Sequence, residues 1–507
     1  MPPTDDATDP LVDFLLEAPL VRDREGESLQ RQLLQRIRSG ILEGRLPSGC
    51  RLPGSRTLAA AIGVSRNSVT AAYDLLSAEG YIELSRQGTR VAAMARAKHG
   101  RHTSRSAPAP VIAARGASIR QNWQNGADTL AFRPGVPALG RFPLGVWKRC
   151  LDRAITSGGA GAMGYGVPQG EEALRAAILH HLAVARGVRA EPEQVVITEG
   201  AQEALALCVR LLTNPGDTAW VEDPGYRGAQ TAFLCGDLNV IPVRVDADGL
   251  QASPDAWARE TPRLIYTTPS HQYPTGAVLP APRRLDLIDK ARAHGAWIIE
   301  DDYDSEFRRS GELVGAMQGL VPHAPVLYIG TFSKTLFPAL RIGFLVLPEA
   351  LAPRAMPLLD ELLRGGHRHE QLALAEFILS GQFGRHLGRM RRLYRSRRDL
   401  LQAALARHLD VPHTVAGGDS GMHLTVRLPA AFDDQRIARA VRQYDMAPAP
   451  LSRFALQPRP EDNGLVLGYG NTSESLFEPL VQRLAKVVRA NGKESDQAAM
   501  PRSGRAI

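Results

Sequence analysis

Two different patterns of apolar and polar positions divide the chain. Between residues 28 and 91, apolar side chains recur at helical spacing. From about residue 128 to 490, short apolar runs such as VVIT, RLIYTTP and VLYIGTF alternate with helical patterns. That alternation is typical of βα units, whose strands form a largely parallel sheet with helices on both faces. The sequence therefore predicts a small helical domain followed by a larger α/β domain.

The first two helices of the small domain are predicted from spacing and from helix-ending signals. Residues spaced by four form one face of the first helix: Leu29, Leu33, Ile37 and Ile41. The second helix is expected to begin with Ser55 as its N-cap, because serine caps helices well. Gly63 supplies the tight turn that follows it.

The third helix carries the polar groups that matter most in this domain. It is expected to begin at the cap Ser65 and to bury one face: Val69, Ala72, Tyr73 and Leu76. Polar side chains gather near its N-terminus, where a recognition helix reaches base edges and phosphates. Two short strands around Gly88 then form a wing. The helical pattern alone also fits a small lid or a dimerisation element.

The complete string over residues 29–91 favours DNA binding. It contains LPSGCRLPGSRTLA, then GVSRNSVTAAYDLLSAEGY and GTRV, and it closely resembles the winged helix-turn-helix of the GntR family. The resemblance implies an α+β domain over residues 20–91 that binds double-stranded promoter DNA. Its contact residues are then expected to be Arg56, Ser65, Arg66, Asn67, Ser68, Thr70, Gln87 and Gly88.

The segments around the large domain differ from it in composition. Residues 92–127 are rich in Ala, Arg, Ser and Pro, and residues 92–120 hold six Lys or Arg and no Asp or Glu. They are predicted to be a mobile basic linker. Residues 128–490 are assigned to the large domain, and the polar residues 491–507 are predicted to be a disordered tail.

Bulk composition excludes several classes of protein. The four cysteines form no CxxC pair, which argues against a disulfide framework or a zinc site and fits a reducing cytosol. No basic-then-apolar leader and no uncharged membrane-length run is present, so a cytoplasmic protein without a membrane partner is expected. The net charge of +8 is compatible with nucleic acid but does not demonstrate it.

Three chemically distinctive side chains follow apolar strands of the large domain. Lys334 comes after VLYIGTFS, while Asp301 and Tyr303 follow the strand WII. An amine can form a Schiff base with an aldehyde cofactor, and a carboxylate can keep a pyridine nitrogen protonated. A lone lysine is usually a surface charge, and the cluster EDDYD alone also fits a solvated loop or a metal site.

Other groups near strand ends are suited to a phosphate and a flat ring. Gly200, Ala201 and Gln202 open a helix, whose N-terminal N–H groups can bind phosphate. Ser333, Thr331 and Arg341 can complete that site. Tyr226 is an aromatic at another strand end, where packing is its commoner role. Ligands of open α/β sheets bind outside the carboxyl ends of the strands, where all these groups are expected.

The motifs together resemble a known family. YGVPQGEEALR, EGAQ, DPGY, PSHQYPTG, EDDYDSEF and GTFSKTLFPALRIGF resemble fold-type I aminotransferases. PSHQYPTG and EDDYDSEFR are most similar to the MocR/GabR group of bacterial regulators, which join a GntR-type head to an aminotransferase-like domain. The resemblance implies a fold-type I domain with a small C-terminal α+β lobe, and pyridoxal phosphate on Lys334.

The resemblance also implies a role for each cofactor-binding residue. Tyr226 would stack on the ring, Asp301 would pair with its nitrogen, and Tyr303 with its hydroxyl. The phosphate would be held by five residues: Gly200, Ala201, Gln202, Ser333 and Arg341. Family members commonly form head-to-tail homodimers, and the linker is long enough to permit one here. No metal is implied.

Two departures from the aminotransferase pattern bear on activity. The asparagine that commonly precedes the Pro-Thr-Gly turn is replaced by Tyr273, or by a preceding residue of His271-Gln272. The late strand over residues 464–468 lacks the usual arginine for a substrate carboxylate. Arg453 and Arg227 are the candidates to replace this arginine, and with His271 they are the candidate effector residues. An effector that is not an amino acid, such as pyridoxal phosphate itself, is equally compatible.

The favoured hypothesis is a pyridoxal phosphate-dependent transcription regulator that senses a small effector and alters promoter binding. The alternative is an active aminotransferase with an appended DNA-binding-like head. The intact recognition helix and the missing arginine favour the regulator. A protein that has lost the cofactor is disfavoured, because Lys334, Asp301, Tyr303 and Arg341 are all present.

Overall fold

The computed structural model of the 507-residue chain forms two compact units, residues 1–110 and 111–507. It describes the backbone of residues 10–17, 20–21, 27–93, 112–117, 119, 129–308 and 315–498, and the side chains as far as residue 492. The division falls inside the predicted linker. No described helix is long and apolar enough to cross a membrane.

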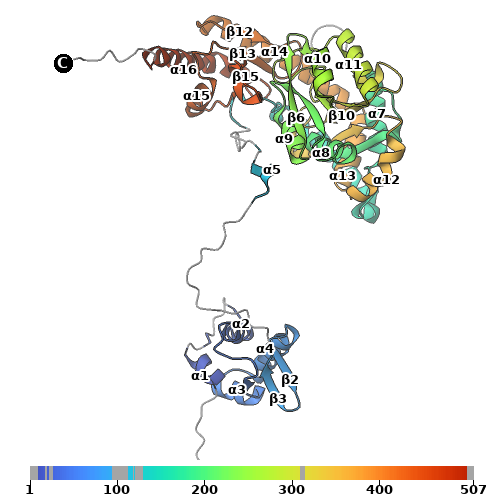
Figure 1. Cartoon of the computed structure of the whole chain (residues 1–507). Helices are drawn as coiled ribbons and strands as arrows, with labels where there is room; N and C mark the ends of the chain where they lie inside the picture. The colour runs from blue at the N-terminus through green and yellow to red at the C-terminus, as the bar shows by residue number, and fades with distance from the viewer. Residues whose placement is uncertain are drawn as a thin grey trace, which may run out of the picture. The chain divides into compact units, whose positions relative to one another are not determined.

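The first unit is a helical bundle with a three-stranded antiparallel sheet in the order β1-β3-β2 (Figure 1). Its elements are α1 (Pro10–Leu16), α2 (Leu29–Leu42), β1 (Arg51–Leu52), α3 (Ser55–Ile62), α4 (Arg66–Ala78), β2 (Ile82–Ser85) and β3 (Gly88–Val91). The predicted inner face of α4 is buried: Val69, Ala72, Tyr73 and Leu76. The predicted three helices and wing are confirmed, and α1 is an addition that the sequence reading missed.

Caps and glycines explain where α3 and α4 begin. Ser65 caps α4 as predicted, since its side chain accepts a hydrogen bond from the Ser68 backbone N–H at 3.1 Å. The prediction for α3 was wrong by one residue. Gly54 is the N-cap without a side-chain bond, and Ser55 is already helical. Gly63 ends α3 at φ 66°, a conformation that glycine adopts without strain.

The second unit is built on an eight-stranded sheet in the order β4-β11-β10-β9-β8-β5-β6-β7. Six strands run in one direction, β11 runs antiparallel between β4 and β10, and the edge strand β7 is antiparallel to β6. The strands are β4 (Val195–Thr198), β5 (Thr218–Asp223), β6 (Asn239–Asp246), β7 (Gly249–Leu250), β8 (Leu264–Thr267), β9 (Trp297–Asp302), β10 (Val326–Thr331) and β11 (Gly343–Val346). The largely parallel sheet is therefore confirmed.

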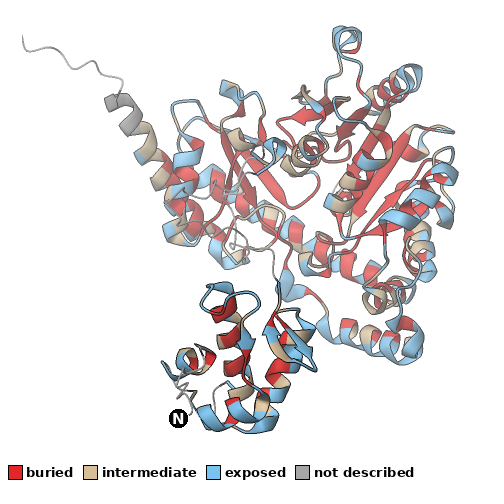
Figure 2. Ribbon diagram, turned by 60° about the horizontal axis from the view of Figure 1, so that its bottom comes forward, coloured by how far each residue is buried: buried red, intermediate tan, exposed pale blue. Residues whose placement is uncertain are grey.

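Helices cover both faces of this sheet, as alternate strand residues show. Val195 and Ile197 belong to one apolar cluster with α6, α7 and α13, whereas Val196 belongs to another with α8, α9 and α12. In Figure 2 the central strands are largely buried and the helices expose their outer sides, whereas β6 near the sheet edge is partly exposed. The helices are α6 (Leu144–Gly158), α7 (Glu172–Arg186), α8 (Ala201–Leu212), α9 (Arg227–Cys235), α10 (Pro254–Arg259), α11 (Ala281–His294), α12 (Ala352–Leu362) and α13 (Arg368–Leu379).

A smaller α+β lobe completes the second unit, as predicted. Its antiparallel sheet has the order β12-β13-β15-β14. Its elements are α14 (Gln382–His408), β12 (Thr414–Ala416), β13 (His423–Arg427), α15 (Asp434–Ala440), β14 (Ala449–Pro450), β15 (Gly464–Gly468) and α16 (Phe477–Ala498). Helix α16 continues past residue 490, so a tail beginning at 491 is too early, and residues 499–507 lie outside the described part.

Part of the predicted linker is ordered against the second unit. Helix α5 (Ala114–Ala117) packs near α9, and Arg115 forms an ion pair with Asp237 at 2.7 Å. Most of the rest of the linker lies outside the described residues. The basic residues of this segment are therefore not all solvated charges, because one of them is bound to an acidic partner.

Candidate functional site

The proposed DNA-contact residues lie on one end of α4, on α3 and on the wing of the first unit. Arg56, Arg66, Asn67 and Thr70 are exposed, and Ser65 and Ser68 form the cap of α4. Gln87 is exposed in the turn between β2 and β3. Within the described part of the chain, neither Arg56 nor Arg66 is in an ion pair. Their charge therefore stays available for phosphates.

The second unit contains a cavity of about 370 Å³ at the carboxyl edge of the large sheet. Eight of the nine predicted cofactor-binding residues line it: Ala201, Gln202, Tyr226, Asp301, Tyr303, Ser333, Lys334 and Arg341. The ninth, Gly200, caps α8 directly beside it. Segments separated by more than a hundred residues in sequence thus supply one wall, and their convergence agrees with the sequence reading.

The reversed strand β11 explains how Arg341 reaches this edge. Parallel strands β9 and β10 carry Asp301 and Lys334 at or beyond their carboxyl ends. Because β11 is antiparallel to β10, its beginning lies at the same edge, where Gly343 pairs with Thr331. Arg341, two residues before that, therefore meets the other groups.

Lys334 is held by a backbone carbonyl across the cavity. Its Nζ donates a hydrogen bond to the carbonyl oxygen of Gly135 at 2.8 Å. Gly135 has φ 77°, and a Cβ added there would lie 2.9 Å from the Lys334 Nζ. Glycine adopts this positive φ without strain, whereas a side chain there would be strained and would displace the amine.

Asp301 has one carboxylate oxygen bonded and one without a partner. Its Oδ2 accepts a hydrogen bond from the Tyr266 hydroxyl at 2.7 Å, whereas its buried Oδ1 has no partner among the described residues. Burial raises the pKa of Asp301 to about 7. A buried acceptor without a partner is costly, so this oxygen is suited to a donor that a ligand brings.

The opposite end of the cavity is suited to an anion. Gly200 caps α8 at φ 86°, so the free N–H groups of Ala201 and Gln202 begin the helix there. The guanidinium of Arg341 bonds to the carbonyl of Glu199 beside this cap, and a Cβ at Gly200 would meet it at 3.4 Å. A helix N-terminus and a guanidinium together form a phosphate-binding arrangement.

Tyr226 joins the anion end to the middle of the cavity. Its hydroxyl accepts a hydrogen bond from the Gln202 amide at 3.1 Å. Burial raises its pKa to about 12, so the phenol keeps its proton at neutral pH. Its ring lies 6.3 Å from that of Tyr266 at an interplanar angle of 30°. An aromatic surface therefore borders the space between Asp301 and the helix N-terminus.

The structure separates the three residues that the sequence left as replacements for the usual asparagine, because His271 and Gln272 do not line the cavity. Tyr273 lines the cavity, whereas Gln272 is buried away from it. The Gln272 amide donates to Glu222 and Pro224 and accepts from Thr275. Gln272 thus fixes the loop, and Tyr273 occupies the position that faces a ligand.

The candidate effector residues do not line the cavity. Arg227 begins α9, Arg453 lies in the turn Leu451–Phe454, and His271 is buried behind Tyr303. A third basic residue, Arg133, lines the cavity with Lys334 and Arg341 and was not predicted from the sequence. No motif marked it, because it lies in an irregular segment before the first strand of the sheet.

Other cavity residues were also missed. Tyr266 comes from the strand RLIYTTP, and its position at a strand end beside Asp301 was a usable signal. His423 begins β13 of the small lobe, and Met422 immediately precedes it. Only the folding of that lobe against the sheet brings them here, so nothing local in the sequence indicates them.

Comparison with known proteins places both units in families. Residues 29–91 match bacterial regulatory proteins of the gntR family, and residues 140–461 match aminotransferase class I and II. The fold and the site therefore define a protein with a GntR-type DNA-binding domain and a domain of the pyridoxal phosphate-dependent aminotransferase class. The chain belongs to the MocR-type transcription regulators.

Two regulators and one solved aminotransferase illustrate these similarities. The probable rhizopine catabolism regulatory protein MocR of Rhizobium meliloti is 40% identical over 89% of this chain and 92% of its own length. The pyridoxine biosynthesis transcriptional regulator PdxR of Corynebacterium glutamicum is 32% identical over 94% and 99%. The α-aminoadipate aminotransferase LysN of Thermus thermophilus has a TM-score of 0.68 at 26% identity, over 75% of this chain and 97% of its own.

Proposed function

We propose that this regulator binds pyridoxal phosphate on Lys334 and senses a small anionic effector in the same cavity. The observation that carries the proposal is the unpartnered Oδ1 of Asp301, buried in a cavity that also holds Lys334 and the N-terminus of α8. A pyridine nitrogen, an aldehyde and a phosphate on one small molecule match these three features in kind. The residues present therefore fit the cofactor.

Each residue would hold one part of the cofactor. Lys334 would form the Schiff base, and Asp301 would keep the ring nitrogen protonated. Ala201, Gln202 and Arg341, with Ser333 and Gly200, would bind the phosphate. Tyr226 would lie against the ring. When bound, the cofactor supplies an electron-withdrawing ring that reacts reversibly with amines.

Arg133 is the residue we propose for the effector. It lines the cavity close enough to Tyr273 for its charge to lower the pKa of that phenol, against the larger effect of burial. A guanidinium there is suited to a carboxylate or a similar anion. Strand β15 offers no arginine for this purpose, which supports a sensing site rather than an efficient aminotransferase.

A regulator also requires two states that the effector distinguishes. Ligand binding shifts an equilibrium only by its difference in affinity for the two states. We propose that the two states are arrangements of a homodimer that hold promoter DNA differently. Exposed apolar side chains on α6, on the turn after it and on α13 support a dimer interface: Leu144, Ile155, Met163, Tyr165 and Leu379.

The test is a titration of the purified protein on the DNA upstream of its own gene, with and without pyridoxal phosphate. We expect specific binding whose affinity changes with the cofactor, and no such change in Lys334→Ala. Binding that ignores pyridoxal phosphate would point to another ligand. An absorbing Schiff base without specific DNA binding would favour the aminotransferase alternative.

A further inference from the structure

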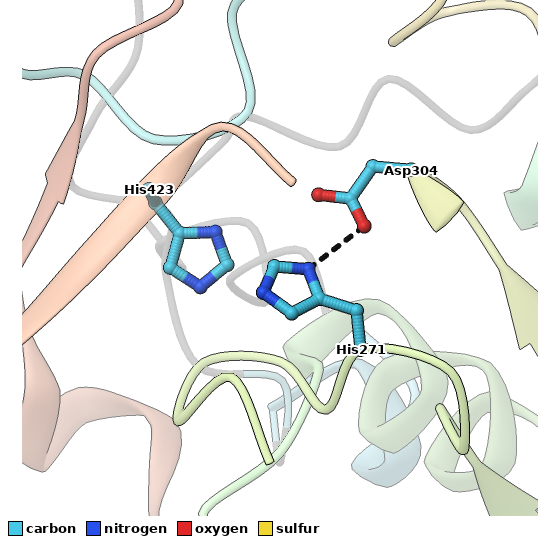
Figure 3. A group of neighbouring side chains, drawn as sticks. All are labelled: His271, Asp304 and His423. Atoms are coloured by element: carbon cyan, nitrogen blue, oxygen red, sulfur yellow. Dashed lines mark hydrogen bonds and ion pairs between the residues drawn. The ribbon is translucent and has the colours of Figure 1, made fainter. Parts of the chain in front are cut away.

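Three buried side chains from separate segments meet at the cavity wall, to which Asp304 and His423 belong. His271 comes from the loop after β8, Asp304 follows β9, and His423 begins β13 (Figure 3). His271 Nδ1 lies 2.8 Å from Asp304 Oδ1 and 3.0 Å from the Tyr303 hydroxyl. Tyr303 and Asp304 both line the cavity, and His271 reaches the ligand site through its contact with Tyr303.

One nitrogen atom cannot serve both neighbours as an acceptor. A single hydrogen lies between Asp304 Oδ1 and His271 Nδ1, whichever of the two atoms carries it. Nδ1 then has no lone pair left to accept a hydrogen bond from Tyr303. The hydroxyl of Tyr303 can therefore donate its hydrogen to another acceptor. Because Tyr303 lines the cavity, a ligand in the cavity can supply that acceptor.

His423 adds no charge beside His271. Its Nε2 lies 3.1 Å from the Pro274 carbonyl, to which it donates, and its ring centroid is 4.9 Å from that of His271. Burial lowers the pKa of His423 to about 3, so this ring is neutral at physiological pH. The hydrogen bond to Pro274 directs the only N–H of His423 away from His271.

We infer that Asp304 and His271 are positioning residues that reserve the hydroxyl hydrogen of Tyr303 for the ring oxygen of the cofactor. The inference rests on the proposed binding of pyridoxal phosphate at Lys334. If Asp304 were absent, Nδ1 would be free to accept from Tyr303, and the donor would turn away from the cavity.

The pH dependence of the Schiff base reports where that donor points. A hydrogen bond to the ring oxygen stabilises its negative charge once the Schiff base has lost its proton. Losing the bond therefore raises the pKa of the Schiff base. Other titratable groups stay unchanged in the comparison. Tyr273, Asp301 and Glu222 also act on Tyr303, Asp302 and Lys334 act on Asp304, and His423 lies beside His271.

The experiment follows the visible absorbance of the full-length protein loaded with pyridoxal phosphate as the pH is varied. The midpoint of this titration is the pKa of the Schiff base. Asp304→Ala should raise that pKa by about one unit, the size expected for one lost hydrogen bond. Tyr303→Phe should raise the pKa of the Schiff base by a similar amount. The double variant Tyr303→Phe with Asp304→Ala should raise it no more than either single variant does. Adding His271→Phe to Asp304→Ala should return the midpoint toward wild type, because the competing acceptor is gone.

A matched control removes a different buried tyrosine–carboxylate bond. Tyr328 donates to Asp302 at 2.6 Å, on β10 beside the site, and Tyr328→Phe should leave the midpoint unchanged. A wild-type midpoint in Asp304→Ala together with a raised one in Tyr303→Phe would overturn this inference alone. Absence of a lysine-bound absorbance band in the wild type would overturn the proposed function with it.

A metal ion would be the other occupant of this cluster. The ligand atoms of His271, Asp304 and His423 lie within 4.8 Å of one another. Stoichiometric zinc in the purified protein that His271→Phe removes would overturn the positioning role. The expected result is a metal-free protein whose absorbance titration does not respond to a chelator.

Discussion

Asp301 shows how a single buried carboxylate can prepare a site for its ligand. Tyr266 satisfies one of its oxygens, and the other lies in the cavity wall without a partner among the described residues. Burial raises its pKa from 3.8 to about 7, and the Tyr266 bond opposes the shift. A ligand with a cationic ring N–H would restore the charged form, since an opposite charge favours the carboxylate.

The raised pKa of Asp301 predicts a pH effect on stability before any cofactor is added. Between pH 3.8 and about 7 the folded protein holds a proton that the unfolded chain has released. The stabilisation is therefore complete below the unfolded pKa and is lost as pH rises through about 7. Relative to Asp301→Asn, the cofactor-free wild type should lose on the order of a few kcal/mol between about pH 4 and about pH 8.

This prediction is checked by calorimetry of the unfolding transition of the large domain. Asp289→Asn is the control, because that carboxylate is 73% exposed in an ion pair with Arg292. It should not change the pH dependence. The same slope in Asp301→Asn and wild type would show that Asp301 titrates as it does in the unfolded chain.

Helix α4 packs into the core with its inner face and presents polar groups to solvent at its N-terminus. Its inner face packs into the core of the first unit, and the Tyr73 hydroxyl donates to the Pro53 carbonyl at 2.9 Å. Its N-terminus carries exposed polar groups beside the Ser65 cap. The packing fixes the helix, and so the exposed end keeps one direction relative to the wing.

Arg66→Ala is predicted to weaken binding to the upstream DNA about tenfold or more, through the loss of a base or phosphate contact. The slope of affinity against salt concentration should become shallower as well. Arg31→Ala is the matched control, since Arg31 is 69% exposed on α2 and pairs with Glu27. Fluorescence anisotropy at two salt concentrations measures the DNA affinity of both variants. An equal loss of affinity in the two would show that α4 is not part of the DNA interface.

The whole chain consists of two units with separate apolar cores. A family that joins DNA binding to a ligand cavity needs a means of coupling them, and a dimer supplies one because its two heads can engage DNA together. Exposed apolar side chains lie along α6, the following turn and α13, and α6 packs against α13, so this is the surface we propose for self-association.

Met163→Asp is predicted to shift the protein toward the monomer, because Met163 is 77% exposed and a buried charge in an interface is costly. Size-exclusion chromatography with light scattering measures the mass at several concentrations. Leu285→Asp on α11 is the control and should leave the dimer intact. A wild-type protein that is monomeric at micromolar concentration would refute the dimer.

The sequence by itself determined the two domain classes and most of the cavity's chemistry. Helical spacing gave the buried face of α4, and apolar runs gave strands whose ends carry Asp301, Tyr303 and Lys334. These are local properties, because side-chain periodicity and strand-end residues depend on near neighbours. They also carried the resemblance that the family comparisons confirm.

Only the tertiary structure decided which side chains share the cavity. It chose Tyr273 over Gln272, brought in Arg133 and His423, and left Arg227 and Arg453 off the wall. It also placed Asp304 and Tyr303 on the same nitrogen of His271. The physical reason is that contacts between distant segments follow from how the small lobe and the irregular segment before the sheet pack against it, which no local pattern encodes.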